Sequence, residues 1–260
     1  DRSIIRDLPD KTEMKVFCSL SPEQAQAYQQ TAQALADALA SADGIQRKGL
    51  VLNYLMRFKQ ICNHPDQLSG SGTYQPQHSA KFRRLQELCS QIEARGEKLL
   101  LFTQFREITD PLAECLAATF GRRGLVLHGG TPIRQRQQMV AAFQREDGPP
   151  FFVLSLKAGG TGLNLTAASH VIHFDRWWNP AIENQATDRA FRIGQQRNVL
   201  VHKFITRGTL EEKIDQLMAD KQACSDQILN AGAEQSLTEL SDDELMALIR
   251  LDLSQTGIDS

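Results

Sequence analysis

Short apolar runs alternate with longer amphipathic stretches from residue 80 onwards. The runs read KLLLF (98–102), LVLH (125–128), FFVLSL (151–156), HVIHF (170–174) and VLVHKF (199–204). Continuous apolar runs, as opposed to a strict polar–apolar alternation, are typical of strands that are buried on both faces. Because helical stretches separate most of them, the pattern predicts an α/β fold with a parallel sheet covered by helices on both faces.

The first part of the chain follows a different pattern. Positions 13–20 alternate between polar and apolar residues, which predicts an extended segment within residues 1–20. The letters SPEQ then form a capping-box pattern, in which Ser21 and Gln24 exchange hydrogen bonds. We expect a helix from there to about Ala42.

A second helical stretch ends against Pro65. Residues 66–79 are rich in Gly, Ser and Pro, so we expect a loop or a partly ordered linker there. Another capping-box pattern, from Ser241 to Glu244, predicts an acidic amphipathic helix near the C-terminal end.

The composition is that of a globular protein, with 41% hydrophobic and 23% charged residues. The formal net charge of −2 excludes a strongly basic nucleic-acid coat but allows a local basic patch. No apolar run approaches the roughly 18 residues that span a bilayer, so no membrane partner is expected. Since the chain begins with Asp1, we expect it to be part of a longer protein.

The cysteines are scattered and form no C-x-x-C pair. This spacing argues against a disulfide scaffold or a zinc site and favours buried thiols in a reducing compartment. Cys62 and His64 could ligate a metal, but no second Cys/His pair stands at ligand spacing, so no metal site is predicted.

The stretch QATDRAFRIGQ (185–195) lies within a predicted helix. Asn179 is a suitable N-cap, Pro180 suits the first helical position, and Gly194 marks the end. On that helix one face would carry Gln185, Arg189 and Arg192, spaced i, i+4 and i+7. An apolar face that could pack on the sheet would carry Ala186, Ala190 and Ile193.

Two arginines on one face allow two interpretations. They could face an anionic ligand, or they could lie on a solvated surface and form weak ion pairs with Glu183 and Asp188. The spacing alone does not separate these possibilities.

Two further segments carry candidate chemistry. SLKAGGTGLNLT (155–166) follows an apolar run, and its glycines would let the backbone approach a phosphate closely, although a tight structural turn explains them equally well. It matches neither the Walker A pattern nor G-x-G-x-x-G. FDRWWNP (174–180) holds the only tryptophans, Trp177 and Trp178. Because neighbours cannot share one face, we expect at least one ring at an interface or stacked on a nucleic acid, unless both pack under a loop.

Together these segments resemble a known family. GEKLLLFTQF (96–105), LHGGTPIRQRQQMVAAFQ (127–144), the block 153–195 and VLVHKFITRGTLEEKI (199–214) are similar to the C-terminal ATPase lobe of the Snf2 (SWI/SNF-like) DNA translocases of helicase superfamily 2. The resemblance covers residues 8–222 and suggests a bacterial relative.

The resemblance implies a RecA-like (P-loop NTPase-type) parallel sheet with an inserted helical protrusion. It divides the chain into a leading segment (1–20), a helical protrusion with its loop (21–79), the RecA-like lobe (80–222) and a C-terminal helical tail (223–260). It also implies a helix over 209–222 that opens with a capping box between Thr209 and Glu212.

Site residues follow from the resemblance as well. Residues similar to helicase motif VI, whose arginines act on ATP phosphates, are Gln185, Arg189 and Arg192. The expected ATP-binding backbone is that of Gly160, Gly162 and Asn164. The expected contacts to the DNA backbone are Thr103, Gln104, His128, Gly129, Thr131, Lys157, Gly159 and Trp178.

The implied function is the C-terminal half of an ATP-dependent double-stranded DNA translocase. ATP and Mg²⁺ would be its cofactors, with Mg²⁺ held by an N-terminal RecA-like lobe of the same polypeptide, because no Walker A or Walker B sequence occurs here. This chain alone is therefore expected to be inactive. Expected partners are that lobe, double-stranded DNA and a further protein.

The expected location is the bacterial cytoplasm at the nucleoid, or the nucleus if the source is eukaryotic. The alternatives are a non-catalytic regulatory or docking lobe and an RNA-directed superfamily 2 helicase. A nicotinamide-dependent oxidoreductase is disfavoured because its fingerprint is absent.

Overall fold

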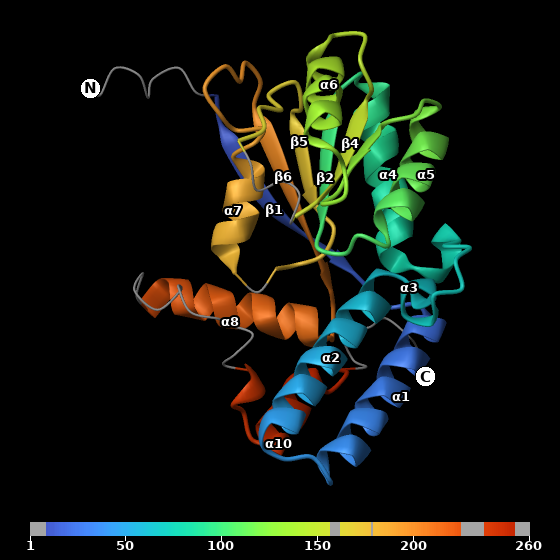
Figure 1. The fold of residues 1–260 in the computed structure, drawn as a ribbon, viewed down its shortest axis with the longest axis vertical. Coiled ribbons are helices and arrows are strands. Elements are labelled where there is room, and N and C mark those ends of the chain that lie inside the picture. The colour runs from blue at the N-terminus through green and yellow to red at the C-terminus, as the bar shows by residue number, and fades with distance from the viewer. Residues whose placement is uncertain (1–8, 157–161, 178, 225–236, 253–260) are drawn as a thin grey trace. The chain divides into compact units, whose positions relative to one another are not determined.

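A computed structural model describes residues 9–156, 162–177, 179–224 and 237–252 (Figure 1). Its six-stranded sheet has the order β1-β6-β5-β2-β4-β3. The strands are β1 (Lys11–Cys18), β2 (Leu99–Thr103), β3 (Leu125–Leu127), β4 (Phe151–Ser155), β5 (His170–His173) and β6 (Val199–Thr206). All five expected apolar runs form strands.

Adjacent strands run parallel from β3 through β4, β2 and β5 to β6. The edge strand β1 follows the same direction. Val199 N donates to Asp10 O at one end of the β1–β6 pair, and Arg207 N donates to Cys18 O at the other, so the register advances along both strands together. The predicted parallel sheet is confirmed.

Helices cover both faces of the sheet, as expected. One face packs against α6 (Ile133–Gln144) and α7 (Pro180–Thr187). On this face the strands contribute the apolar side chains of Leu100, Phe102, Phe152, Leu154, Val171, Val199 and Val201. The opposite face meets α5 (Thr109–Phe120), where the rings of Phe120 and Phe151 lie 5.5 Å apart. α4 (Ala80–Ala94) lies beside α5 on the same side of the sheet (Figure 1).

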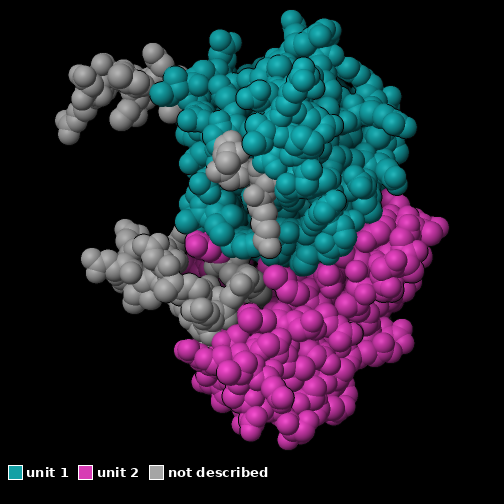
Figure 2. Space-filling model, viewed as in Figure 1, with its two compact units in different colours: residues 1–16, 84–177, 181–204 teal, residues 17–83, 178–180, 205–260 magenta. Residues whose placement is uncertain are grey.

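The chain divides into two compact units, which Figure 2 shows in different colours. The first holds residues 1–16, 84–177 and 181–204 and contains most of the sheet. The second holds residues 17–83, 178–180 and 205–260. Its core joins apolar residues of α1 (Pro22–Leu39), α2 (Gly44–Asn63), α8 (Leu210–Cys224) and α10 (Asp242–Ile249).

Two of the expected capping boxes are present. Ser21 Oγ accepts from Gln24 N while Ser21 N donates to Gln24 Oε1. Ser241 and Glu244 make the same pair of bonds at the start of α10. Both helix starts could be read from the sequence because their partners are only three residues apart.

The expected capping box of α8 is wrong in detail. Thr209 Oγ1 accepts from Glu211 N at 3.2 Å, and Glu212 accepts from Gly208 N at 2.8 Å. The cap carboxylate therefore bonds one residue earlier than a capping box requires. The neighbouring carboxylate of Glu211 also bonds the backbone before the helix, because it accepts a hydrogen bond from Thr206 N at 2.9 Å.

Residues 66–79 are more ordered than a linker. They contain most of α3 (Pro65–Ser69) and the short 3₁₀ helix η2 (Pro76–His78). Asp66 accepts from Tyr74 N at 2.8 Å, and Ser79 Oγ donates to Asn63 O at 2.6 Å. These bonds satisfy backbone groups that a Gly- and Ser-rich composition would leave to water. Of the two expectations, a loop is confirmed for residues 70–75, and a partly ordered linker is wrong.

Four cysteines are buried: Cys18, Cys62, Cys89 and Cys115. Burial raises the pKa of Cys62 to about 12 and that of Cys115 to about 11. Thiols held in this form are poor nucleophiles, which confirms the interpretation of these four as buried structural residues. No helix in the described part of the chain is long and apolar enough to cross a membrane.

Candidate functional site

Several of the expected site residues lie where the parallel strands end. Thr103 closes β2, the 128–131 turn follows β3, and Asp175 comes two residues after β5. These strand ends share one edge of the sheet, the edge at which open α/β sheets bind ligands. The sequence order alone did not show which of these segments are neighbours.

Asp175 shapes the turn after β2. Its carboxylate accepts from the hydroxyl of Thr103 and, at 2.9 Å, from Gln104 N. Thr103 is fully buried and Gln104 is 8% exposed. Asp175 was not among the expected site residues, although an acidic residue directly after the apolar run HVIHF is a recognisable signal for a strand-end ligand.

Hydrogen bonds within the HGGT turn (128–131) after β3 hold the turn in place. Thr131 N donates to His128 O at 2.9 Å, and Gly130 N donates to His128 Nδ1 at 3.2 Å. Arg136 of α6 donates to the carbonyl oxygens of Thr131 and Gly129 at 2.8 and 3.2 Å. Gly129 and Gly130 remain exposed, so their backbone can be approached closely.

The helix that was expected to run to Gly194 is shorter. α7 ends at Thr187, and residues 188–194 form turns. The carbonyl of Arg189 accepts from Leu165 N at 2.9 Å, so it is no longer available to an amide one helical turn further on. The prediction of one shared helix face is therefore wrong for Gln185, Arg189 and Arg192.

The apolar face of that helix is only partly as expected. Ala186 and Ala190 are buried, at 7% and 0% exposure, and belong to the core beside the sheet. Ile193 is 74% exposed, because it lies in the turns beyond α7. Its predicted packing on the sheet is wrong.

The turns nevertheless bring two expected segments together. Leu165 N bonds to Arg189 O, and Arg192 Nη1 lies 3.5 Å from Gly162 O. Gly162 and Asn164 are exposed, and Gly162 has a positive φ of 48° that favours glycine. The glycine-rich segment and the arginine segment thus form one surface.

Arg189 is an unusual cation. It is 7% exposed, and its Nε has no hydrogen-bond partner among the described residues. Burial, followed by the nearby Arg192, lowers the pKa of Arg189, while Asp188 raises it. A buried guanidinium that lies beside a second one, and whose Nε has no hydrogen-bond partner in the described part of the chain, favours an external anion.

Glu183 is not the surface partner that the alternative interpretation required. It is 1% exposed and accepts from Arg176 Nε at 2.8 Å, not from either arginine of the pair. The expected pairing of Arg189 and Arg192 with Glu183 is therefore wrong, whereas Asp188, the other expected partner, lies near enough to Arg189 to raise its pKa, and Arg192 is exposed as that interpretation required.

Several expected residues lie outside the described part of the chain: Lys157, Gly159, Gly160 and Trp178. The neighbouring Trp177 lies within the described part. It is half-buried and packs against the core beside the sheet. Gln185 is exposed on α7.

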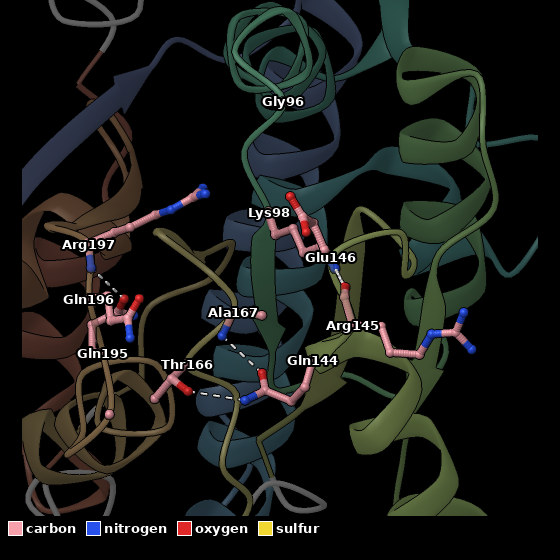
Figure 3. A pocket seen from close by; sticks show the side chains of 11 residues that line it. Gly96, Lys98, Gln144, Arg145, Glu146, Thr166, Ala167, Gln195, Gln196 and Arg197 are labelled. Carbon is pink, nitrogen blue, oxygen red and sulfur yellow. Dashed lines mark hydrogen bonds between the residues drawn. The ribbon is translucent and has the colours of Figure 1, made fainter.

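A polar pocket of about 430 Å³ lies at the opposite, amino-terminal edge of the sheet (Figure 3). Lys98, which precedes β2, and Arg197, which precedes β6, line it with Gln144 at the end of α6. The side chain of Gln144 holds the loop at residues 166–167, because it donates to Thr166 Oγ1 and accepts from Ala167 N (Figure 3). None of the expected site residues lines this pocket in the described part of the chain.

Comparison with known proteins agrees with the geometry. Residues 80–194 match the family described as the helicase conserved C-terminal domain, and residues 2–67 match the SNF2-related domain. The chain is 47% identical over 260 residues to the putative ATP-dependent helicase/translocase YwqA of Bacillus subtilis, covering 96% of this chain and 27% of that protein.

Solved structures show the same relationship. The SWI2/SNF2 ATPase core of Sulfolobus solfataricus in complex with dsDNA is 42% identical, with a TM-score of 0.84, over 97% of this chain and 53% of that one. The C-terminal domain of the Sulfolobus solfataricus SWI2/SNF2 ATPase is 39% identical, with a TM-score of 0.81, over 94% of this chain and 100% of that one. The chain therefore belongs to the SWI2/SNF2 family and corresponds to its C-terminal RecA-like ATPase domain.

Proposed function

We propose that this chain is the C-terminal lobe of an ATP-dependent translocase that moves on double-stranded DNA. The observation that carries the proposal is the arginine pair, in which a buried Arg189 and an exposed Arg192 lie together with no bonded carboxylate among the described residues. The relatives support it, since one is named an ATP-dependent helicase/translocase and a solved homologue is bound to dsDNA.

The two arginines would act on the γ-phosphoryl group of ATP. A guanidinium is planar and permanently charged, and it presents donors that match phosphate oxygens. Arg189 would supply a fixed positive field, because its burial restricts its movement. Arg192 would reach the phosphate from the exposed turn and stabilise the charge that spreads over the oxygens during transfer. Gly162 and Asn164, beside them, would contact the nucleotide.

The strand ends would contact the DNA backbone. The exposed backbone of Gly129 and Gly130 and the neighbouring Arg136 offer donors and positive charge for phosphates. Contacts of this kind position a duplex without reading its sequence. We therefore expect weak DNA binding that falls steeply with salt, as counterion release requires.

The rest of the ATP site would lie on the other lobe. This sequence has no Walker A loop. The described residues hold no group of three or more His, Cys, Asp or Glu side chains that could bind a metal ion. Mg²⁺ would therefore be bound by the N-terminal lobe of the intact protein, and the two lobes would close around ATP.

The test is ATP hydrolysis by the intact protein with duplex DNA, single-stranded DNA or RNA. We expect duplex DNA to stimulate hydrolysis most. Arg192→Ala should lower the stimulated rate by about 10³-fold or more. Arg145→Ala is the matched control, because Arg145 is also exposed but lies at the opposite edge of the sheet.

The other functions are outcomes of the same test. Preferential stimulation by RNA would indicate an RNA-directed helicase. Absence of hydrolysis with every nucleic acid would indicate a docking lobe. An unchanged rate in Arg192→Ala would reject the arginine assignment.

A further inference from the structure

Arg106 follows β2 but places its guanidinium at the turn that follows β3. A Cβ atom on Gly130 would lie 3.8 Å from Arg106 Nη2. β4 stands between β2 and β3 in the sheet, so the arginine side chain reaches Gly130 only by crossing the end of β4. Its backbone is fixed where this path begins, because Arg106 O accepts from Thr109 N at 3.1 Å and from Thr109 Oγ1 at 2.7 Å.

The position of this guanidinium is not explained by an ion pair. Arg106 is exposed, and its side chain makes no hydrogen bond or ion pair among the described residues. The HGGT turn contains no acidic residue. Arg136 brings a second positive charge to the turn through its bonds to the carbonyl oxygens of Thr131 and Gly129. The exposed turn therefore carries positive charge that favours an external anion.

His128 supplies a further donor at the same place. Its Nδ1 accepts from Gly130 N at 3.2 Å, so the proton of the neutral ring is on Nε2. A Cβ atom on Gly130 would lie 3.3 Å from His128 Cε1, the carbon to which Nε2 is bonded. The N–H group of the imidazole and the guanidinium of Arg106 therefore both lie next to Gly130.

Gly130 leaves open the space beside these two donors. The residue is exposed and its φ does not lie in the left-handed region, so the backbone alone does not require glycine. A side chain there would approach the ring of His128 to 3.3 Å, closer than an ordinary van der Waals contact. Without one, an oxyanion can approach the backbone and both side-chain donors.

We propose that Arg106, His128 and the open side of Gly130 bind one phosphate of the DNA backbone, and that Arg106 contributes most of the affinity of this contact. The inference rests on the function proposed above and adds Arg106 to its DNA surface. A phosphodiester fits this group because it offers one oxygen to the guanidinium and another to the imidazole N–H. The contact reads no base, so it holds a duplex of any sequence.

The test is binding of the intact protein to a fluorescent duplex DNA at a series of salt concentrations. Arg106→Ala should weaken binding by about tenfold at low salt, because a charged hydrogen-bond donor is lost. The slope of log K against log salt should become shallower by about 1, because one phosphate fewer is neutralised. A second duplex of unrelated sequence should show the same loss.

Arg123→Ala is the matched control. Arg123 is also exposed and belongs to the same unit, but it precedes β3 and therefore lies at the opposite edge of the sheet. Its affinity should stay within about twofold of that of the unaltered protein, with the same salt slope. Arg106→Gln, which keeps much of the side chain and loses the charge, decides the matter if Arg106→Ala does not fold.

A double-variant cycle tests whether the two side chains share one phosphate. His128→Asn keeps an oxygen that can accept from Gly130 N but places no donor at the position of Nε2. If the phosphate is shared, Arg106→Ala weakens binding less in the His128→Asn protein than in the unaltered one. Equal losses in both backgrounds would overturn the single shared site.

The remaining outcomes separate this contact from the function on which it rests. An unchanged salt slope in both Arg106 variants, with steeply salt-dependent binding by the unaltered protein, would overturn the contact alone. Absence of salt-dependent duplex binding by the unaltered protein would instead reject the proposed function, and the contact with it.

Discussion

Two buried cations of this chain are treated in opposite ways. Lys81 is fully buried and donates to Glu211 Oε1 at 2.7 Å and to Asn63 Oδ1 at 3.1 Å. Arg189 is 7% exposed and lies beside another arginine, and no carboxylate bonds it among the described residues. The first charge is satisfied within its own unit, and the second lacks a bonded anion among the residues that the structure describes.

The difference separates a structural charge from a functional one. Glu211 also accepts from Thr206 N, so the Lys81 ion pair fixes the end of β6. Such a pair resists replacement of one partner because the other charge stays buried. Arg189 has the reverse property: its removal relieves a repulsion in the free protein and costs activity only where an anion binds.

The largest effect is expected from Arg189→Met in the intact protein. Duplex-stimulated hydrolysis should fall by about 10³-fold or more, because a transition-state charge loses its fixed guanidinium. The free energy of unfolding of the 260-residue chain should change by less than about 1 kcal/mol. Steady-state kinetics and urea denaturation measure the two. A large loss of stability with unchanged hydrolysis would make Arg189 a structural residue like Lys81.

Lys81→Met should show the opposite balance. The free energy of unfolding of the 260-residue chain should fall by about 3–5 kcal/mol, because Glu211 is left buried without its cation. Adding Glu211→Leu should restore a large part of that loss. Urea denaturation of both variants tests this, and a double variant no more stable than the single one would contradict the ion-pair explanation.

Two histidines show a third solution, which is to remain uncharged. Burial lowers the pKa of His173 to about 4 and, together with the neighbouring His170, that of His202 to about 4. Both values lie below the ordinary 6.5, so the unfolded chain binds more protons between pH 6.5 and 4. Stability should therefore fall as the pH drops through that window.

At pH 5 the loss should be about 2 kcal/mol for each of the two groups relative to pH 7.5. Urea denaturation at both values measures it. His173→Gln should reduce the pH dependence by about half. An unchanged pH dependence in that variant would mean that His173 is not kept neutral by the fold.

The smallest effect is expected at a cation near the surface. Arg47 donates to the carbonyl oxygens of Thr238 and Leu240 and pairs with Asp242 at 2.7 Å. Asp242 is 53% exposed, so solvent screens the pair. Arg47→Met should cost about 1 kcal/mol, and less at high salt. A loss as large as that of Lys81→Met would show that exposure does not decide the cost.

Much of the fold could be predicted because its signals are local. The buried runs gave the strands, and the Ser21 and Ser241 capping boxes need partners only three residues away. The end of α7 could not be predicted, because the amide that takes the carbonyl of Arg189 belongs to Leu165 in another segment. Lys81 and Glu211 are 130 residues apart, so no sequence pattern pairs them.

The sequence could mark candidate site residues but not their geometry. The resemblance marked Arg189 and Arg192, but only the structure shows that one is buried and the other exposed. Asp175 was assigned no role and Glu183 was given the wrong partners, because their real partners depend on which strands are neighbours and on how residues 176 and 177 lie against α7.

The position of β1 has a consequence for how the chain is made. β1 is the outermost strand and pairs with β6, so Asp10 finds its partner Asn198 only 188 residues later. At about 5–20 residues per second, a ribosome would need roughly 10–40 s to supply that partner. Until then the backbone of β1 is an open template for other chains, so slower synthesis or a truncated product should favour aggregation.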